Sequence, residues 1–258
     1  MMRFAVAAVI AAACVCVHVS PDPAPASLVP GPAVAEAGPA GPGPAATGMI
    51  KGTVVFEGPA PERAKVPRFS DPYCAKTEML SDEVIVTDGK LRDVLVRIKN
   101  GSLPALAPSA APPPAMLDQK DCSYAPHVLG VVVGQKLSVR NSDGTFHNVH
   151  GTIAGAQLWN KPESPGDPAL SLDGSAHAGD VIDVICDVHP WMNAYAVVQD
   201  HKAFAVTGDD GAFELAGLPP GNYTVEAWHP VLGTRSVAVK LARGAKPATV
   251  KLSFTASH

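Results

Sequence analysis

The sequence predicts an all-β protein built from sandwiches or barrels. From Met49 onward, short runs rich in β-branched residues alternate with Gly, Pro, Asn and Asp, which is typical of strands and turns. No stretch keeps a convincing helical period. Many short strands must bury their apolar faces between sheets, which favours these two architectures. The expected strands lie within residues 50–58, 83–89, 93–101, 129–144, 180–188, 194–200, 211–230, 234–241 and 248–254.

Residues 1–19 have the pattern of a secretory signal. Arg3 is followed by an apolar stretch from Phe4 to Val17, which is too short to span a membrane. Two cleavage points stay open, one before Cys14, which would leave a cysteine for a lipid anchor, and one near residues 33–36. We therefore expect an exported protein that is periplasmic or tethered at the cell surface.

The composition divides the rest of the chain. Residues 20–47 are mostly Pro, Ala and Gly and predict a disordered tether, because they offer little apolar surface to bury. We expect one domain over residues 48–200, interrupted by a proline-rich loop at 100–117, and a second over residues 201–258. The net charge of −4, with scattered Lys and Arg, argues against a nucleic-acid partner. The oligomeric state is not indicated.

The segment "VICDVHPWMNAY" places a cysteine, a histidine and a methionine within seven positions. Side chains alternate along a strand, so Cys186 continues the inward-facing series of Ile182 and Val184. Pro190 prevents the strand from continuing. The three candidate ligands Cys186, His189 and Met192 then lie on a tight loop between two strands, where they can converge.

A fourth ligand is expected from "FHNVHG". His147 follows a turn at residues 142–145, and His150 competes with it. Three positions apart on an extended chain, the two side chains face opposite sides of the sheet, and we favour His147 as the inward one. A thiolate, two imidazoles and a weak thioether are the ligands of a blue-copper site. Zinc is the alternative metal, but methionine is a poor zinc ligand.

"FHNVHG" followed by "CDVHPWM" resembles the cupredoxin family, in its amicyanin-like and plastocyanin-like members, over about residues 128–199. The resemblance implies a Greek-key β-sandwich or barrel that holds one type-1 copper ion. It also implies that Asn148 uses its backbone amide to hydrogen-bond the cysteine sulfur. The implied copper ligands are His147, Cys186, His189 and Met192.

The segment after Asp200 resembles a different family. Its "GDDG" and "LPPG" turns, each followed by a strand, resemble the carboxypeptidase-regulatory, transthyretin-like sandwiches over about residues 202–254. This resemblance implies a small accessory module rather than an enzyme. The expected core residues are Phe213, Leu215, Leu218, Tyr223 and Val225.

The cysteine count predicts one disulfide. Cys14 and Cys16 fall within the signal, and Cys186 is assigned to the metal. Cys74 and Cys122 remain, both in polar, turn-like segments, and we expect them to pair in an oxidising compartment.

No catalytic pattern accompanies these features. The sequence has no Gly-rich phosphate loop, no nucleophile elbow and no His-x-His pair of a multicopper oxidase. The other histidines have no partners at ligand spacing, and the carboxylates are interpreted as turn and surface residues. These histidines are His127, His177, His201 and His229, and the carboxylates are Asp143, Asp209, Asp210 and Glu214.

The hypothesis is therefore a non-enzymatic carrier of single electrons between redox protein partners. The alternatives are copper handling or delivery, and a surface β-sandwich whose site is empty. We expect His189 to lie on an exposed loop and to serve as the electron port, with Pro190 and Trp191 as an apolar docking rim. The other interpretation is that Trp191 packs under the loop and stabilises it.

Overall fold

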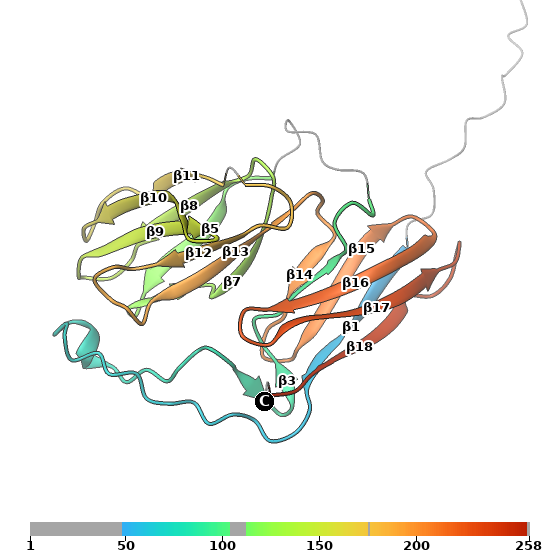
Figure 1. Cartoon of the computed structure of the whole chain (residues 1–258), viewed down its shortest axis with the longest axis horizontal. Coiled ribbons are helices and arrows are strands. Elements are labelled where there is room, and N and C mark those ends of the chain that lie inside the picture. The colour runs from blue at the N-terminus through green and yellow to red at the C-terminus, as the bar shows by residue number, and fades with distance from the viewer. Residues whose placement is uncertain (1–47, 104–111, 175, 257–258) are drawn as a thin grey trace, which may run out of the picture. The chain divides into compact units, whose positions relative to one another are not determined.

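The computed structural model describes residues 48–103, 112–174 and 176–256 and is built from strands (Figure 1), so the predicted all-β class is confirmed. The expected signal, the tether, Cys14 and the centre of the proline-rich loop lie outside these residues. Within them, no helix is long and apolar enough to cross a membrane.

Eighteen strands and one short 3₁₀ helix, η1, make up the described structure. Their bounds in chain order are β1 Gly48–Phe56, η1 Cys74–Lys76, β2 Val86–Thr87, β3 Lys90–Leu91, β4 Leu95–Ile98, β5 Ala115–Lys120, β6 Ser123–Ala125, β7 Val128–Val132, β8 Lys136–Asn141, β9 His147–Ile153, β10 Ala156–Glu163, β11 Leu170–Asp173, β12 Val181–Ile185, β13 Asn193–Gln199, β14 Phe204–Val206, β15 Ala212–Leu218, β16 Gly221–His229, β17 Gly233–Leu241 and β18 Ala248–Phe254.

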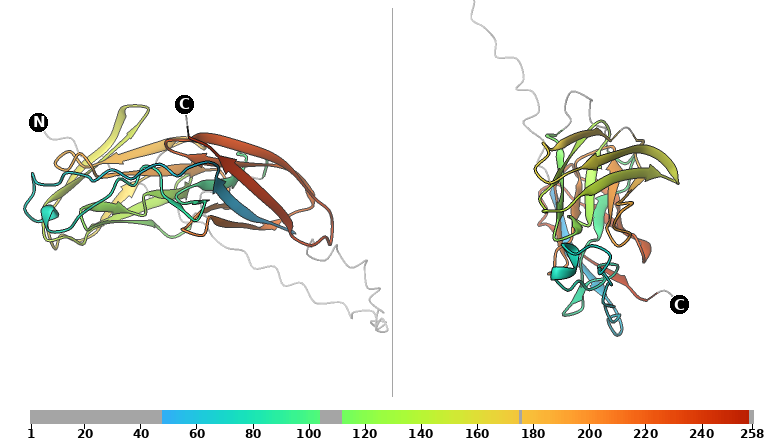
Figure 2. Two further views of the ribbon diagram at one scale, coloured as in Figure 1. Left: turned by 90° about the horizontal axis from the view of Figure 1, so that it is seen from below. Right: turned by 90° about the vertical axis from the view of Figure 1, so that its left-hand side faces the viewer.

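The first sandwich contains the sequence motifs for metal binding. Its five-stranded sheet has the order β10-β9-β12-β13-β7, and its four-stranded sheet has the order β11-β8-β5-β6. Leu117 and Leu137 of the smaller sheet share one apolar core with Val149, Ile182 and Val184 of the larger sheet. Figure 2 shows these strands from two further sides. The sheets fix the places where β9 begins, at His147, and where β12 ends, directly before Cys186.

The second sandwich combines strands from both ends of the described chain. One sheet joins β15, β1, β3 and β2, with β18 beside β1, and the other has the order β14-β4-β16-β17. Side chains of β16 point alternately toward the core and toward solvent, and those of Tyr223, Val225 and Ala227 face the core. The expected boundary placed residues 48–200 in one domain, but β1 and β4 pair with strands from after residue 200. The C-terminal segment is too short to cover its own apolar faces, so it takes these strands from the N-terminal part.

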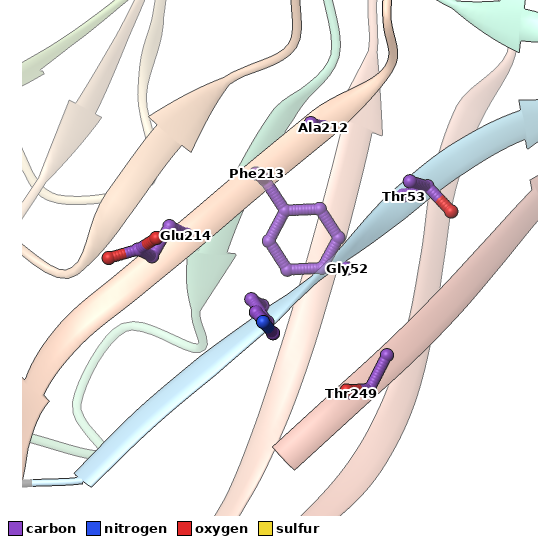
Figure 3. A pocket seen from close by; sticks show the side chains of 7 residues that line it. Gly52, Thr53, Ala212, Phe213, Glu214 and Thr249 are labelled. Carbon is purple, nitrogen blue, oxygen red and sulfur yellow. The ribbon is translucent and has the colours of Figure 1, made fainter. Parts of the chain in front are cut away.

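The pairing of β1 requires a glycine at its centre. A Cβ atom on Gly52 would lie 1.9 Å from the carbonyl oxygen of Val250 in β18 and 2.9 Å from the ring of Phe213 in β15. Figure 3 shows the Phe213 ring lying over β1 at this point. Gly52 therefore permits both neighbouring strands to approach β1 closely.

The chain between β1 and β2 contains a long loop, which we call the strap (residues 64–81). Its two ends pair through the bridge between Lys65 and Leu80, and η1 lies near its tip. A disulfide between Cys74 in η1 and Cys122 after β5 attaches the strap, with the two Cα atoms 5.7 Å apart. The strap thereby reaches the metal-site end of the first sandwich.

Lowering the pH should destabilise the protein through His229. The ring is buried, and its Nδ1 accepts hydrogen bonds from the N–H groups of Val231 and Leu232. Burial and the nearby charge of His127 lower the pKa of His229 to about 4, so the folded state resists protonation. The neutral His229 ring therefore makes its full contribution to the free energy of unfolding above the ordinary histidine pKa of about 6.5. This contribution falls as the pH drops toward 4, and the total loss is up to about 3 kcal/mol.

Denaturant unfolding of the wild type and His229→Asn at pH 7 and pH 4.5 measures this loss. Asparagine keeps an acceptor near the Nδ1 position and does not titrate, so its stability should fall less over that range. His177→Asn is the matched control, because the His177 side chain is 100% exposed. An equal pH dependence in the wild type and His229→Asn would contradict the prediction.

Candidate metal centre

Three buried donor atoms converge between β9 and the loop after β12. The Nδ1 atoms of His147 and His189 lie 2.9 Å apart, and the Cys186 sulfur lies 3.7 Å from Nδ1 of His189. The ligand atoms of the three residues lie within 4.8 Å of one another. Met192 is buried in the same core as Cys186. The structure thus brings three predicted ligands together and places the fourth in the same core.

Local structure explains this convergence. His147 is the first residue of β9, and Cys186 directly follows β12, whose Ile182 and Val184 face the core as predicted. Beyond the cysteine, the backbone N–H of Met192 donates to the carbonyl of His189, and the N–H of Cys186 donates to the carbonyl of Met192. These bonds close a tight loop before β13.

The two histidines of β9 face different sides, as expected. His147 is fully buried, whereas His150 is partly exposed and its Nδ1 lies 2.9 Å from a carboxylate oxygen of Asp187. Only His147 therefore lies with the cysteine and His189 in the cluster.

The protonation states of the donors suit a cation. Burial lowers the pKa of His147, although Asp143 opposes this effect, so the ring is neutral at pH 7 and can act as a ligand. Burial raises the pKa of the Cys186 thiol, against the effect of the backbone N–H groups of Asn148, Val188 and His189. A metal ion would displace the thiol proton, because the thiolate is the ligand form.

Asn148 joins the two ligand-bearing segments. Its backbone N–H is one of the groups that lower the pKa of the Cys186 thiol, against the effect of burial. Its side-chain oxygen also accepts the N–H of Asp187, at 2.6 Å. The Asp187 carboxylate in turn accepts hydrogen bonds from the side-chain amides of Asn148 and Asn160. These hydrogen bonds hold β9, which carries His147, against the loop after β12, which carries Cys186 and His189.

The expected exposure of His189 is wrong. Its side chain is 3% exposed, and the strap covers it: Asp71 places a carboxylate oxygen 3.0 Å from Nε2, and the Cys74 sulfur is 3.8 Å from the same atom. Burial alone would raise the pKa of Asp71, but hydrogen bonds from His189 and Thr145 and from the backbone at the start of η1 (residues 73 and 74) lower it to about 2. The sequence could not show this, because the strap is 118 positions away from the histidine.

Asp143 also differs from its expected role as a turn or surface residue. Its side chain is 2% exposed, and Oδ2 lies 2.9 Å from Nε2 of His147. Sequence reasoning missed both Asp143 and Asp71. The only available signal for Asp143 was its position four residues before His147, and Asp71 had none beyond its closeness to Cys74.

The predicted docking residues differ in exposure. Pro190 is exposed, whereas Trp191 is partly buried, with its ring centroid 5.1 Å from that of His189. The Trp191 indole N–H donates to the carbonyl of Cys122. Trp191 therefore lies beside the ring of His189 and is attached to the backbone at Cys122.

The donor set fits copper better than zinc. The far nitrogens of both imidazoles face carboxylates, and the two Nδ1 atoms lie 2.9 Å apart, so both can bind one cation there. A thiolate, two imidazoles and a buried thioether are soft and intermediate donors, which suit copper. The neighbouring groups that include Cys74 or Cys122 offer no thiolate while the disulfide is intact.

Comparisons with known proteins give only partial likenesses. No protein-family model and no curated protein matches the chain. Among solved structures, a purple cupredoxin from Nitrosopumilus maritimus is similar at 23% identity over 33% of this chain and 99% of that one, with a TM-score of 0.28. A reduced Cu(I) proline-to-glycine variant of amicyanin is similar at 27% identity over 40% and 98%, with a TM-score of 0.30. An oxidised amicyanin variant is similar at 30% identity over the same shares, also with a TM-score of 0.30. At these low TM-scores, the function must be inferred from the chain's own residues.

Proposed function

We propose that this protein is an exported type-1 copper protein that carries single electrons between redox protein partners. The observation that supports this proposal is the buried cluster of His147, Cys186 and His189, with Met192 in the same core. A copper ion held there would cycle between Cu(I) and Cu(II). The two sheets hold the donors in place, which keeps their rearrangement small when an electron arrives or leaves.

Titration of the purified, metal-free protein with Cu(II) tests the proposal. We expect one tightly bound copper ion and a strong blue thiolate-to-copper absorption band. A colourless titration would remove the carrier function and favour the empty-site alternative. A blue protein with slow, irreversible redox behaviour would favour copper delivery. The strap and the buried ligands argue against delivery, because metal exchange between proteins requires accessible donors.

Met192→Gln should keep the copper ion but lower its reduction potential. The axial thioether is a weak ligand, and a harder oxygen donor favours Cu(II) over Cu(I). Voltammetry of the copper-loaded variant measures the shift. Met116→Gln is the matched control, because Met116 is 50% exposed and lies in β5, outside the ligand loop. Loss of copper binding in Met192→Gln would contradict the axial assignment.

Trp191→Ala should slow electron exchange several-fold while leaving the blue band nearly unchanged. His189 is covered, and Trp191 is the partly exposed aromatic ring beside it, so we expect electrons to enter past this ring and Pro190. Electron self-exchange measured by NMR line broadening needs no identified partner. Trp191→Phe keeps the ring and should retain most of the rate. If Trp191→Ala loses copper or stability while exchange is normal, Trp191 is a packing residue and the port lies elsewhere.

A further inference from the structure

Both imidazoles of the metal centre have a carboxylate on the nitrogen that faces away from the cluster. Nε2 of His189 lies 3.0 Å from Oδ2 of Asp71, and Nε2 of His147 lies 2.9 Å from Oδ2 of Asp143. An ionised carboxylate only accepts, so each Nε2 carries a proton and donates it. The Nδ1 atoms, which face each other and the cysteine sulfur, are thereby left free for a cation.

The same two carboxylates also hold the two halves of the disulfide. The backbone N–H of Cys74 donates to Oδ1 of Asp71, at 3.2 Å, and that of Cys122 donates to Oδ2 of Asp143, at 2.8 Å. Each aspartate therefore links one imidazole to one half-cystine. Because Cys74 and Cys122 are bonded to each other, the disulfide connects the Asp71–His189 pair covalently to the turn that Asp143 holds beside His147.

Local turn formation accounts for only part of this arrangement. Asp71 accepts the N–H groups two and three residues ahead through Oδ1, as a turn-forming aspartate does. Its other oxygen, Oδ2, is engaged by Thr145 and His189, which lie far away in the sequence. Asp143 accepts from Asp121, Cys122 and His147 and makes no comparable turn of its own. The contacts to the histidines are thus additional to the local ones.

We propose that Asp71 and Asp143 are positioning residues that, with the Cys74–Cys122 disulfide, form a clasp that sets the metal affinity and the reduction potential of the centre. The proposal rests on the proposed copper function. A carboxylate on the far nitrogen fixes the tautomer and orientation of a ligand histidine and makes it more basic. Two negative charges near the site also favour Cu(II) over Cu(I). The clasp should therefore hold the potential low.

Asp71→Asn and Asp143→Asn test the clasp without removing an acceptor oxygen. Each substitution should weaken Cu(II) binding about 10- to 100-fold. Each tenfold loss that is selective for Cu(II) raises the potential of a one-electron couple by about 59 mV. Asp93→Asn is the matched control, because Asp93 is also a buried aspartate but lies between β3 and β4 of the other sandwich. It should change neither the affinity nor the potential.

Two further measurements separate this inference from the copper assignment. Nitrogen-15 NMR of the metal-free protein should show protonated Nε2 atoms on His147 and His189 with slow hydrogen exchange, and each Asn variant should speed up exchange at its own ring. Zn(II) titration should show the same 10- to 100-fold weakening in the two variants, even if the wild type gives no blue band. Unprotonated Nε2 atoms in the wild type, or variants whose metal affinity and potential are unchanged, would overturn the clasp.

Discussion

Cys186→Ser should abolish the blue absorption band completely. The band arises from charge transfer between the cysteine sulfur and copper, and a serine hydroxyl has no soft thiolate to supply it. Cys186 is the one cysteine outside the disulfide among the described residues, so none of the other described cysteines offers a thiolate to the cluster. Absorption spectroscopy after addition of one equivalent of Cu(II) measures the effect.

The matched control is the partly exposed histidine of β9, His150. His150→Asn keeps a hydrogen-bond donor toward Asp187 and should retain the full band, since His150 lies outside the donor cluster. If Cys186→Ser stayed blue, the copper would be held elsewhere and the assignment of all four ligands would fail. If His150→Asn lost the band, the choice of His147 over His150 would need revision.

Removing the disulfide by Cys74→Ser/Cys122→Ser should lower the free energy of unfolding by about 4 kcal/mol on chain-entropy grounds. The bond closes a loop with a sequence separation of 48, and without it the unfolded chain gains freedom. Denaturant unfolding of the metal-free protein gives the difference without a contribution from copper binding. An unchanged stability would mean that the strap is held mainly by its other contacts.

Those other contacts are specific. The buried Arg68 guanidinium donates to the carbonyls of Asp121 and Thr77, which ties the strap to the same turn as the disulfide. Peptide mapping of exported protein without reductant should recover Cys74 and Cys122 in one linked fragment. Free thiols at both positions would contradict the pairing and weaken the expectation of an oxidising compartment.

The sequence alone was enough for the fold class and for the local arrangement of the candidate ligands. Alternation of apolar residues along β12 placed Cys186 inward, and the proline after His189 indicated the loop. Strands that are short or have polar or irregular patterns were missed, namely β3, β5, β6, β9, β10, β11 and β14. In β10, for example, Trp159 and Glu163 are buried while Asn160 and Lys161 between them are exposed, which is not a simple alternation.

The domain boundary and the surroundings of the histidines depend on contacts between residues that are far apart in the sequence. β1 pairs with β15 and β18, whose residues lie more than 150 positions later, and nothing in the local pattern of β1 indicates its partners. The cover on His189 likewise comes from Asp71, a residue that reads as part of an ordinary polar turn. Local periodicity determines which way a side chain points, so the sequence was enough to predict the candidate donor set. Which distant segment fills the space around those donors is decided by the packing of the whole chain, and only the tertiary structure placed a carboxylate on each imidazole.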